Sequence, residues 1–84
     1  MKKQIKIYSI STCNHCRCAK NLLIRHGVKF ECEDLDLAHK DKVASLMEEV
    51  RRLNSRCSFP TIIIGEKVIV GYKEELIEEA LEND

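Results

Sequence analysis

Two cysteines separated by two residues, Cys13 and Cys16, form the part of this sequence whose residue types and spacing could do chemistry. Such a pair can cycle between a dithiol and a disulfide, or it can supply half of the ligands of a structural zinc site. A structural zinc site usually takes a second pair of this kind, and the sequence contains none. The other cysteines and histidines match no common ligand spacing, so the sequence favours a redox-active dithiol.

The residues on either side of the pair predict a strand before it and a helix after it. Residues 3–9 alternate between apolar and polar side chains, which indicates a strand that leads directly to the pair. Residues 14–26 have helical spacing, and Gly27 is a suitable end for that helix. The apolar face of the helix is expected to contain Cys16, Ala19, Leu22, Leu23 and His26.

This placement predicts different roles for the two thiols. A cysteine at the start of a helix meets unpaired backbone N–H groups and the positive end of the helix dipole, and both favour the thiolate. Cys13 occupies that position, whereas Cys16 lies one turn further along, on the expected buried face. We therefore expect Cys13 to be the nucleophile and Cys16 to resolve the mixed disulfide that forms at Cys13.

The next two predicted elements are a strand and a helix. Residues 28–36 suggest a strand at the edge of a sheet, with Val28, Phe30 and Cys32 on one side. Residues 40–54 carry apolar side chains at helical spacing, which is typical of a helix packed on a core.

The last part of the chain predicts a hairpin and a helix. Residues 61–64 and 67–70 are rich in β-branched side chains around a short turn, and Gly71 separates them from an amphipathic segment. The resulting order is β-α-β-α-β-β-α, with the first two strands parallel through a right-handed crossover. We therefore expect one α/β domain over residues 1–84.

Length and composition exclude several classes of function. The 14 basic and 14 acidic residues cancel, and the two Tyr, two Phe and no Trp offer little for base stacking, so neither nucleic acid nor an anionic membrane is an expected partner. No apolar run suits a signal peptide or a membrane span, and we expect a cytoplasmic protein. Five cysteines are an odd number, which disfavours a structural disulfide framework in a reducing compartment.

Pro60 stands directly before the β-branched run of the predicted hairpin. A proline in this place often only marks the first residue of a strand. If its bond to Phe59 is cis, it forms a deliberate turn that exposes the Phe59 backbone for pairing with an extended substrate segment.

Taken together, these features resemble the glutaredoxin family of the thioredoxin fold. The resemblance covers nearly all of the chain. It rests on Tyr8-Ser9 before Cys13-x-x-Cys16, Ala19-Lys20 with Leu22-Leu23, Gly27-Val28, Asp34-Leu35-Asp36, Ser58-Phe59-Pro60-Thr61 and Val70-Gly71.

The resemblance carries expectations for fold and site. It implies a four-stranded mixed sheet in the order 2-1-3-4 flanked by three helices, with a cis Phe59–Pro60 bond that faces the cysteine pair. It implies that the protein is a thiol–disulfide oxidoreductase and electron carrier, a monomer whose only redox group is the Cys13–Cys16 disulfide, with no other cofactor. Phe59 and Pro60, together with Gly71 and Tyr72, are the expected substrate-binding residues.

The departures from the family pattern concern the electron donor. Glutaredoxins that use glutathione typically have a lysine where this chain has Ile10, and a second glycine and an acidic pair near Tyr72 and Lys73. The chain is more similar here to glutaredoxin-like redoxins that are reduced by thioredoxin reductase and serve ribonucleotide reductase. We expect a thioredoxin-reductase or ferredoxin-linked reductase as donor. The alternatives are a glutathione-dependent glutaredoxin and a metal or iron–sulfur carrier that uses the Cys-x-x-Cys pair.

Several other residues could adjust the pair. Thr12, Asn14 and His15 are expected to modulate it, with Asn14 standing where the family usually has a proline. Cys18 and Cys32 are expected to be small packed side chains. The residues before a cis-proline approach the site, so Cys57 is either a structural residue or a regulatory, glutathionylated or metal-binding thiol.

The position of His15 generates a prediction about reduction potential. A protonated or hydrogen-bonding imidazole there would stabilise the Cys13 thiolate and make the disulfide easier to reduce than that of thioredoxin, at about −270 mV. Replacing His15→Tyr should therefore make the pair more reducing, as measured by equilibration with a dithiol buffer. An unchanged or more oxidising value would contradict the role of the imidazole.

Overall fold

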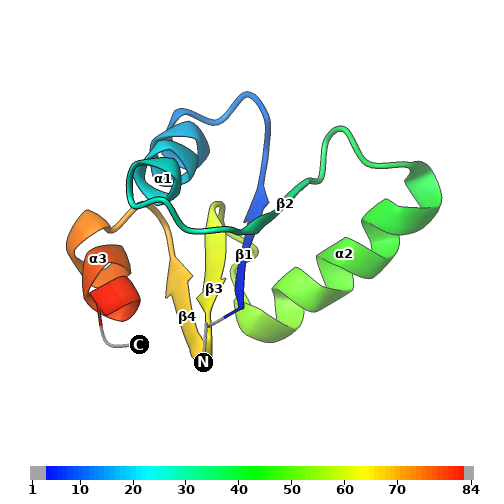
Figure 1. The fold of residues 1–84 in the computed structure, drawn as a ribbon. Helices are drawn as coiled ribbons and strands as arrows, with labels where there is room; N and C mark the ends of the chain where they lie inside the picture. Colours follow the sequence, from blue (N-terminus) through cyan, green and yellow to red (C-terminus); the bar gives the residue numbers. More distant parts are fainter. Residues whose placement is uncertain (1–3, 83–84) are drawn as a thin grey trace.

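The computed structural model describes residues 4–82, in which helices cover both faces of one four-stranded sheet (Figure 1). The predicted order of elements is confirmed. In chain order they are β1 (Ile5–Ser9), α1 (Asn14–Arg25), β2 (Glu31–Asp34), α2 (Lys40–Leu53), β3 (Thr61–Ile64), β4 (Lys67–Val70) and α3 (Glu74–Glu82).

The strands lie side by side in the order β2-β1-β3-β4. β1 pairs with β2 in parallel and with β3 antiparallel, and β4 returns antiparallel along β3. This is the predicted thioredoxin-like order 2-1-3-4, with β2 at an edge as expected. One register pair has a consequence for the site: Ser9, the last residue of β1, lies opposite Asp34, the last residue of β2.

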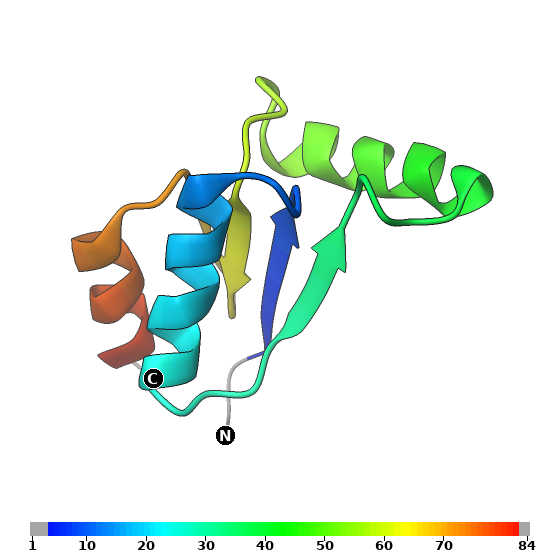
Figure 2. The ribbon, with the colours of Figure 1, turned by 90° about the horizontal axis from the view of Figure 1, so that it is seen from above.

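The sheet separates two hydrophobic clusters. α1 and α3 lie on one face of the sheet and α2 lies on the other, as Figures 1 and 2 both show. The α1/α3 cluster contains Ile5, Ile7, Ala19, Leu22, Leu23, Ile62, Ile64, Ile69, Ile77 and Ala80, and the α2 cluster contains Tyr8, Leu35, Leu46 and Val50. The alternating side chains of β1 supply both clusters, which is why its pattern could be recognised.

α2 is also fixed to the sheet by polar contacts. The Tyr8 hydroxyl donates a hydrogen bond to Glu49 Oε2 at 2.9 Å, and Lys6 Nζ lies 3.9 Å from the same oxygen. Burial and the neighbouring carboxylate raise the pKa of Tyr8 to about 12. The hydroxyl therefore stays protonated and keeps donating across the neutral pH range.

Both predicted boundaries of β2 differ from the structure. β2 begins at Glu31 instead of residue 28 and ends at Asp34 instead of residue 36. Val28 and Phe30 precede the strand, although both pack against the α1/α3 cluster, so their apolar pattern reports burial and not pairing with β1. The expected start of the first strand at Lys3 lies outside the described residues.

His26 was expected on the buried face of α1, and that prediction is wrong. The helix ends at Arg25, and His26 is its exposed C-cap. His26 Nε2 lies 3.2 Å from Glu78 Oε2 of α3. Gly27 follows with a φ of +68°, in the left-handed region that ends helices at low steric cost.

A helix needs about 20 apolar residues to cross a bilayer. α2, the longest helix, has 14 residues and an apolar stripe on only one side. Within residues 4–82, no helix is both long and apolar enough to span a membrane.

Adjacent residues of α1 provide a test of this packing. Leu23 is fully buried, whereas Ile24 is 62% exposed. We expect Leu23→Ala to lower the free energy of unfolding by about 2–5 kcal/mol because it leaves a cavity, and the matched control Ile24→Ala to change it by less than about 0.5 kcal/mol. Denaturant unfolding of both variants measures the difference, and equal costs would contradict the described orientation of α1.

Candidate active site

Cys13 caps the N-terminus of α1, as the sequence predicts. Its backbone is extended, with φ −82° and ψ 122°, and its carbonyl accepts the first helical hydrogen bond from the Arg17 N–H at 3.1 Å. The Cys13 N–H donates to the Ile10 carbonyl at 3.0 Å, which turns the chain between β1 and α1. The thiol is partly exposed at the end of the helix.

The free N–H groups of the first helical turn act on the Cys13 sulfur. The Cys16 N–H donates to Cys13 Sγ at 3.4 Å. This backbone hydrogen bond, followed by one from the Cys16 thiol, holds the pKa of Cys13 below its ordinary value, and the backbone N–H of His15 adds to the effect. Cys13 is therefore the more acidic thiol of the pair, because the hydrogen bonds favour its charged form.

Cys16 has the opposite character. It is fully buried on the sheet side of α1. Burial raises the pKa of its thiol to about 11, and a backbone hydrogen bond from Ile10 only partly opposes this. The site thus holds an accessible sulfur that ionises readily one helical turn from a buried sulfur that keeps its proton.

A second loop carries the buried Pro60. The Phe59–Pro60 peptide bond is cis, as the family resemblance implies. The Pro60 carbonyl accepts a hydrogen bond from the Gly71 N–H at 2.8 Å, which joins this loop to the segment after β4. Among the described residues no hydrogen bond uses the backbone of Phe59, so its N–H and C=O are free to pair with another chain.

The loop before Pro60 is organised by Asn54, a residue that the sequence analysis did not single out. Asn54 is 8% exposed, and its Nδ2 donates to the Ser58 carbonyl at 3.1 Å. Its Oδ1 accepts from the Arg56 N–H at 3.1 Å, and the Thr61 hydroxyl also donates to the Ser58 carbonyl, at 2.7 Å. In the sequence, a single asparagine after an amphipathic helix indicates only where the helix ends, so the role of Asn54 could not be predicted.

A groove of about 420 Å³ runs along the outer side of α1, next to the loop between β4 and α3. Figure 2 shows this loop passing beside the first turns of α1. The groove is lined by Cys18, Asn21, Ile24, Arg25 and Tyr72. Tyr72, an expected substrate-binding residue, therefore lies between this groove and the α1/α3 cluster against which it packs.

The residues predicted to modulate the pair are on the surface. Thr12, Asn14 and His15 are all exposed. The structure shows a contribution of the His15 backbone to Cys13, and the role of its imidazole stays a prediction.

A polar cluster that the sequence analysis missed connects α1 to the ends of β1 and β2. Lys20 Nζ lies 2.7 Å from Asp34 Oδ1, and the hydroxyl of the buried Ser9 donates to the same oxygen. Nearby, Asp36 accepts hydrogen bonds from the backbone N–H, at 2.9 Å, and the hydroxyl of Ser11. Asp36 thus fixes the loop that leads to Cys13.

Comparisons with known proteins agree with this geometry. The model of the glutaredoxin family matches residues 5–69. The chain is 33% identical, over 93% of its length and 97% of that protein, to an uncharacterized glutaredoxin-like 8.6 kDa protein in the rubredoxin operon of Clostridium pasteurianum. The chain belongs to the glutaredoxin family. It is therefore related to thiol redox proteins, and the predicted recognition is confirmed.

Two solved structures are similar to this glutaredoxin in both sequence and fold. Methanoredoxin of Methanosarcina acetivorans is 42% identical, with a TM-score of 0.91 over 95% of this chain and 85% of the other. The glutaredoxin-like NrdH-redoxin of Escherichia coli, described as having a thioredoxin-like activity profile, is 25% identical, with a TM-score of 0.75 over 90% and 92% of the two chains.

The three remaining cysteines of this glutaredoxin are free thiols. The expectation that Cys18 and Cys32 are packed is wrong, because both side chains are exposed. Cys57 is partly buried against the α2 cluster and has a φ of +52°, unusual for a residue with a side chain. Within residues 4–82, no three His, Cys, Asp or Glu side chains gather as a group that could hold a metal ion.

The opposite acidities of the two thiols generate a prediction for this glutaredoxin. Alkylation follows the thiolate fraction, so the rate at Cys13 should rise with pH. It should reach its plateau at a lower pH than the rate of a thiol with the ordinary pKa of about 8.5. Cys16, with a pKa of about 11, should stay nearly unmodified at pH 8. Timed iodoacetamide labelling followed by peptide mapping measures both rates, and labelling of the exposed Cys18 is followed in the same samples for comparison. Faster labelling of Cys16 than of Cys13 would contradict the assignment.

Proposed function

We propose that this glutaredoxin is a dithiol oxidoreductase that reduces protein disulfides through Cys13 and Cys16. One observation carries the proposal: a partly exposed sulfur that accepts a backbone hydrogen bond lies one helical turn from a fully buried thiol. The Cys13 sulfur can attack a disulfide from solution. The Cys16 thiol is shielded from solution and reacts only once Cys13 has formed a mixed disulfide, whose Cys13 sulfur it attacks. The protein needs no cofactor beyond this disulfide for that chemistry, and we place it in the cytoplasm.

The reaction has two exchange steps. In the first, the Cys13 thiolate attacks one sulfur of the substrate disulfide, forms a mixed disulfide, and releases the other substrate sulfur as a thiolate that takes up a proton. In the second, Cys16 loses its proton and attacks the Cys13 sulfur. The second substrate thiolate leaves and is protonated, so that two electrons have reduced the substrate and the Cys13–Cys16 disulfide has formed.

The loop that carries Pro60 supports a protein substrate. The free backbone of Phe59 offers a donor and an acceptor to an extended segment that carries the substrate cysteine. Gly71 is bonded to Pro60 and Tyr72 follows it, so these residues would border the same segment. Recognition through the main chain would accept many sequences, as a general disulfide reductant requires.

The surroundings of the pair support a protein as electron donor. The side chain of Ile10, which stands where glutathione-using relatives typically have lysine, packs against the α2 cluster. It supplies neither a charge nor a hydrogen bond to a glutathione carboxylate. We propose that a thioredoxin-reductase or ferredoxin-linked reductase returns the electrons, and the likeness to a redoxin with a thioredoxin-like activity profile supports this choice. The Tyr72–Lys73 region makes ribonucleotide reductase a candidate target.

The donor assignment can be tested directly. Reduction of insulin disulfides should proceed with thioredoxin reductase or a ferredoxin-linked reductase, and more slowly with glutathione, glutathione reductase and NADPH. Cys13→Ser should lower the rate by about 100-fold or more because it removes the attacking sulfur. Cys16→Ser should accumulate a mixed disulfide at Cys13, visible by intact mass.

Two results would overturn the proposal. Full activity of Cys13→Ser would rule out the mechanism, and faster turnover with glutathione would identify a glutathione-dependent glutaredoxin. Stoichiometric metal bound through Cys13 in anaerobically purified protein would instead favour the carrier function. The matched control is Cys18→Ser, which removes an exposed thiol from the same helix and should leave insulin reduction unchanged.

A further inference from the structure

The ion pair between Lys20 of α1 and Asp34 of β2 is distinctive in this structure. Its N–O distance is 2.7 Å and each side chain is only 23% exposed. Among the ion pairs of residues 4–82, no other has both side chains less than a quarter exposed. A half-buried ammonium is costly unless it is paired, so its position invites a functional explanation.

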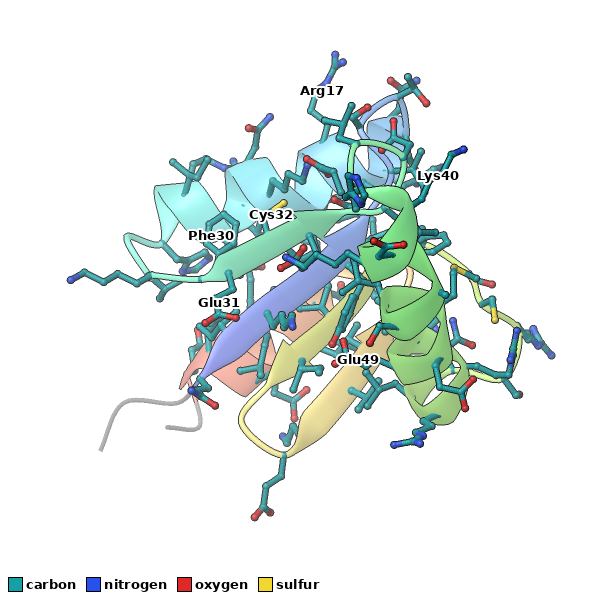
Figure 3. The ribbon with its side chains drawn as sticks, turned by 90° about the vertical axis from the view of Figure 1, so that its right-hand side faces the viewer. Arg17, Phe30, Glu31, Cys32, Lys40 and Glu49 are labelled. Atoms are coloured by element: carbon teal, nitrogen blue, oxygen red, sulfur yellow. The ribbon has the colours of Figure 1, made fainter. Side chains whose placement is uncertain are left out.

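Lys20 follows Cys16 by four residues, which places the two side chains next to each other on the same side of α1. Cys16 is fully buried there, and Lys20 extends from the same side to the ends of the strands. Arg17, in contrast, points away from the sheet in Figure 3. Lys20 is therefore the cation of α1 that lies on the side of the buried thiol.

Asp34 and Ser9 hold the ammonium in place. Asp34 Oδ1 accepts from both Lys20 and the Ser9 hydroxyl, and Ser9 is fully buried at the end of β1. Cys32 Sγ lies 3.7 Å from Ser9 Oγ and 3.8 Å from Asp34 Oδ1, on the α1 side of β2 (Figure 3). Three elements thus fix the position of the Lys20 ammonium, whereas the ammonium of a surface lysine is mobile.

A positive charge near Cys16 would favour the second exchange step. Burial raises the pKa of Cys16 to about 11, and the positive charge of Lys20 acts in the opposite direction. The titratable groups that act on Cys16 are Cys13 and Lys20, and Lys20 in turn faces Asp34 and Cys32 of β2. A thiolate forming in this low-polarity site gains more from a nearby ammonium than it would in water.

We propose that Lys20, held by Asp34 and Ser9, is a positioning residue that stabilises the Cys16 thiolate while it attacks the mixed disulfide. The inference rests on the proposed dithiol mechanism. In that step the Cys16 S–H proton goes to solvent, the new Cys13–Cys16 bond forms, and the bond from Cys13 to the substrate sulfur breaks. Lys20 keeps its own proton throughout, and its charge offsets the negative charge that develops on Cys16.

The test separates the two exchange steps. A peptide disulfide is mixed with the reduced protein, samples are quenched with acid, and mass spectrometry follows the mixed disulfide at Cys13. Lys20→Met should slow its decay at pH 7 by about 5- to 10-fold, because removing the charge raises the pKa of Cys16. Because the Cys16 pKa of about 11 lies far above this range, the slowing should stay the same between about pH 6 and 9. Formation of the mixed disulfide, measured in a Cys16→Ser background, should change by less than about twofold.

Two further substitutions separate charge from structure. Lys20→Gln keeps a hydrogen-bond donor for Asp34 but removes the charge, and it should slow the second step as Lys20→Met does. Lys20→Arg should restore a rate within about twofold of the parent. The matched control is Lys42→Met. Lys42 belongs to α2, on the other face of the sheet, and its Nζ lies 3.3 Å from Glu33 Oε1 of β2. Its replacement should leave both steps unchanged.

A normal second step in folded Lys20→Gln, or equal slowing by Lys42→Met, would overturn the inference. These results are distinct from failure of the proposed function, which would appear as a parent protein that forms no mixed disulfide at Cys13. Thermal unfolding of each variant, followed by circular dichroism, identifies any variant that fails to fold, and Lys20→Arg then decides.

Discussion

The hydrogen bond from the Cys16 N–H to the Cys13 sulfur is the interaction on which the rest of the site depends. It exists because Cys13 caps α1, where backbone donors lack helical partners. The same helical turn that places a donor beneath one sulfur carries the other into the core. Two chemically identical side chains thereby acquire opposite acidities, and the role of the sheet is to provide the surface that buries the second one.

The remaining parts of the site reach this helix end through separate structural supports. The Ser11–Asp36 contacts fix the approach from β1, and the Gly71–Pro60 hydrogen bond joins the two loops on the far side. The Lys20–Asp34 pair connects α1 to β2 one helical turn after the buried Cys16. None of these contacts shares a residue with another, so the helix end is held from several directions by interactions that are each modest in energy.

Local patterns explain why much of this fold could be predicted. The β-branched run and short turn predicted β3 and β4 with their observed bounds, and the start of α1 at Asn14 followed from the change of periodicity. Those signals lie within a few residues of each other. The position of β2 could not be predicted in the same way, because pairing with β1 decides where it begins, and Val28 and Phe30 are partly buried without being paired.

Polar contacts between residues far apart in the chain could also not be predicted from the sequence. Lys20 lies in the crossover helix and Asp34, 14 residues later, ends β2, and only the parallel register of β1 and β2 brings Asp34 beside Ser9. His26 has the spacing of a buried residue, yet α1 ends at Arg25 and His26 is its exposed C-cap. Periodicity describes a face of a helix, but it does not say at which residue the helix ends.

The Asn54 side chain has a consequence for how the protein family can vary. It holds the loop before Pro60 through backbone atoms of Arg56 and Ser58 and through the Thr61 hydroxyl. The side chains of Ser55 and Arg56 are exposed and take no part in that support. The loop can therefore exchange its surface residues while Pro60 keeps its place. Substitutions at Ser55 or Arg56 would therefore change the surface beside Pro60 without removing the contacts that hold this loop.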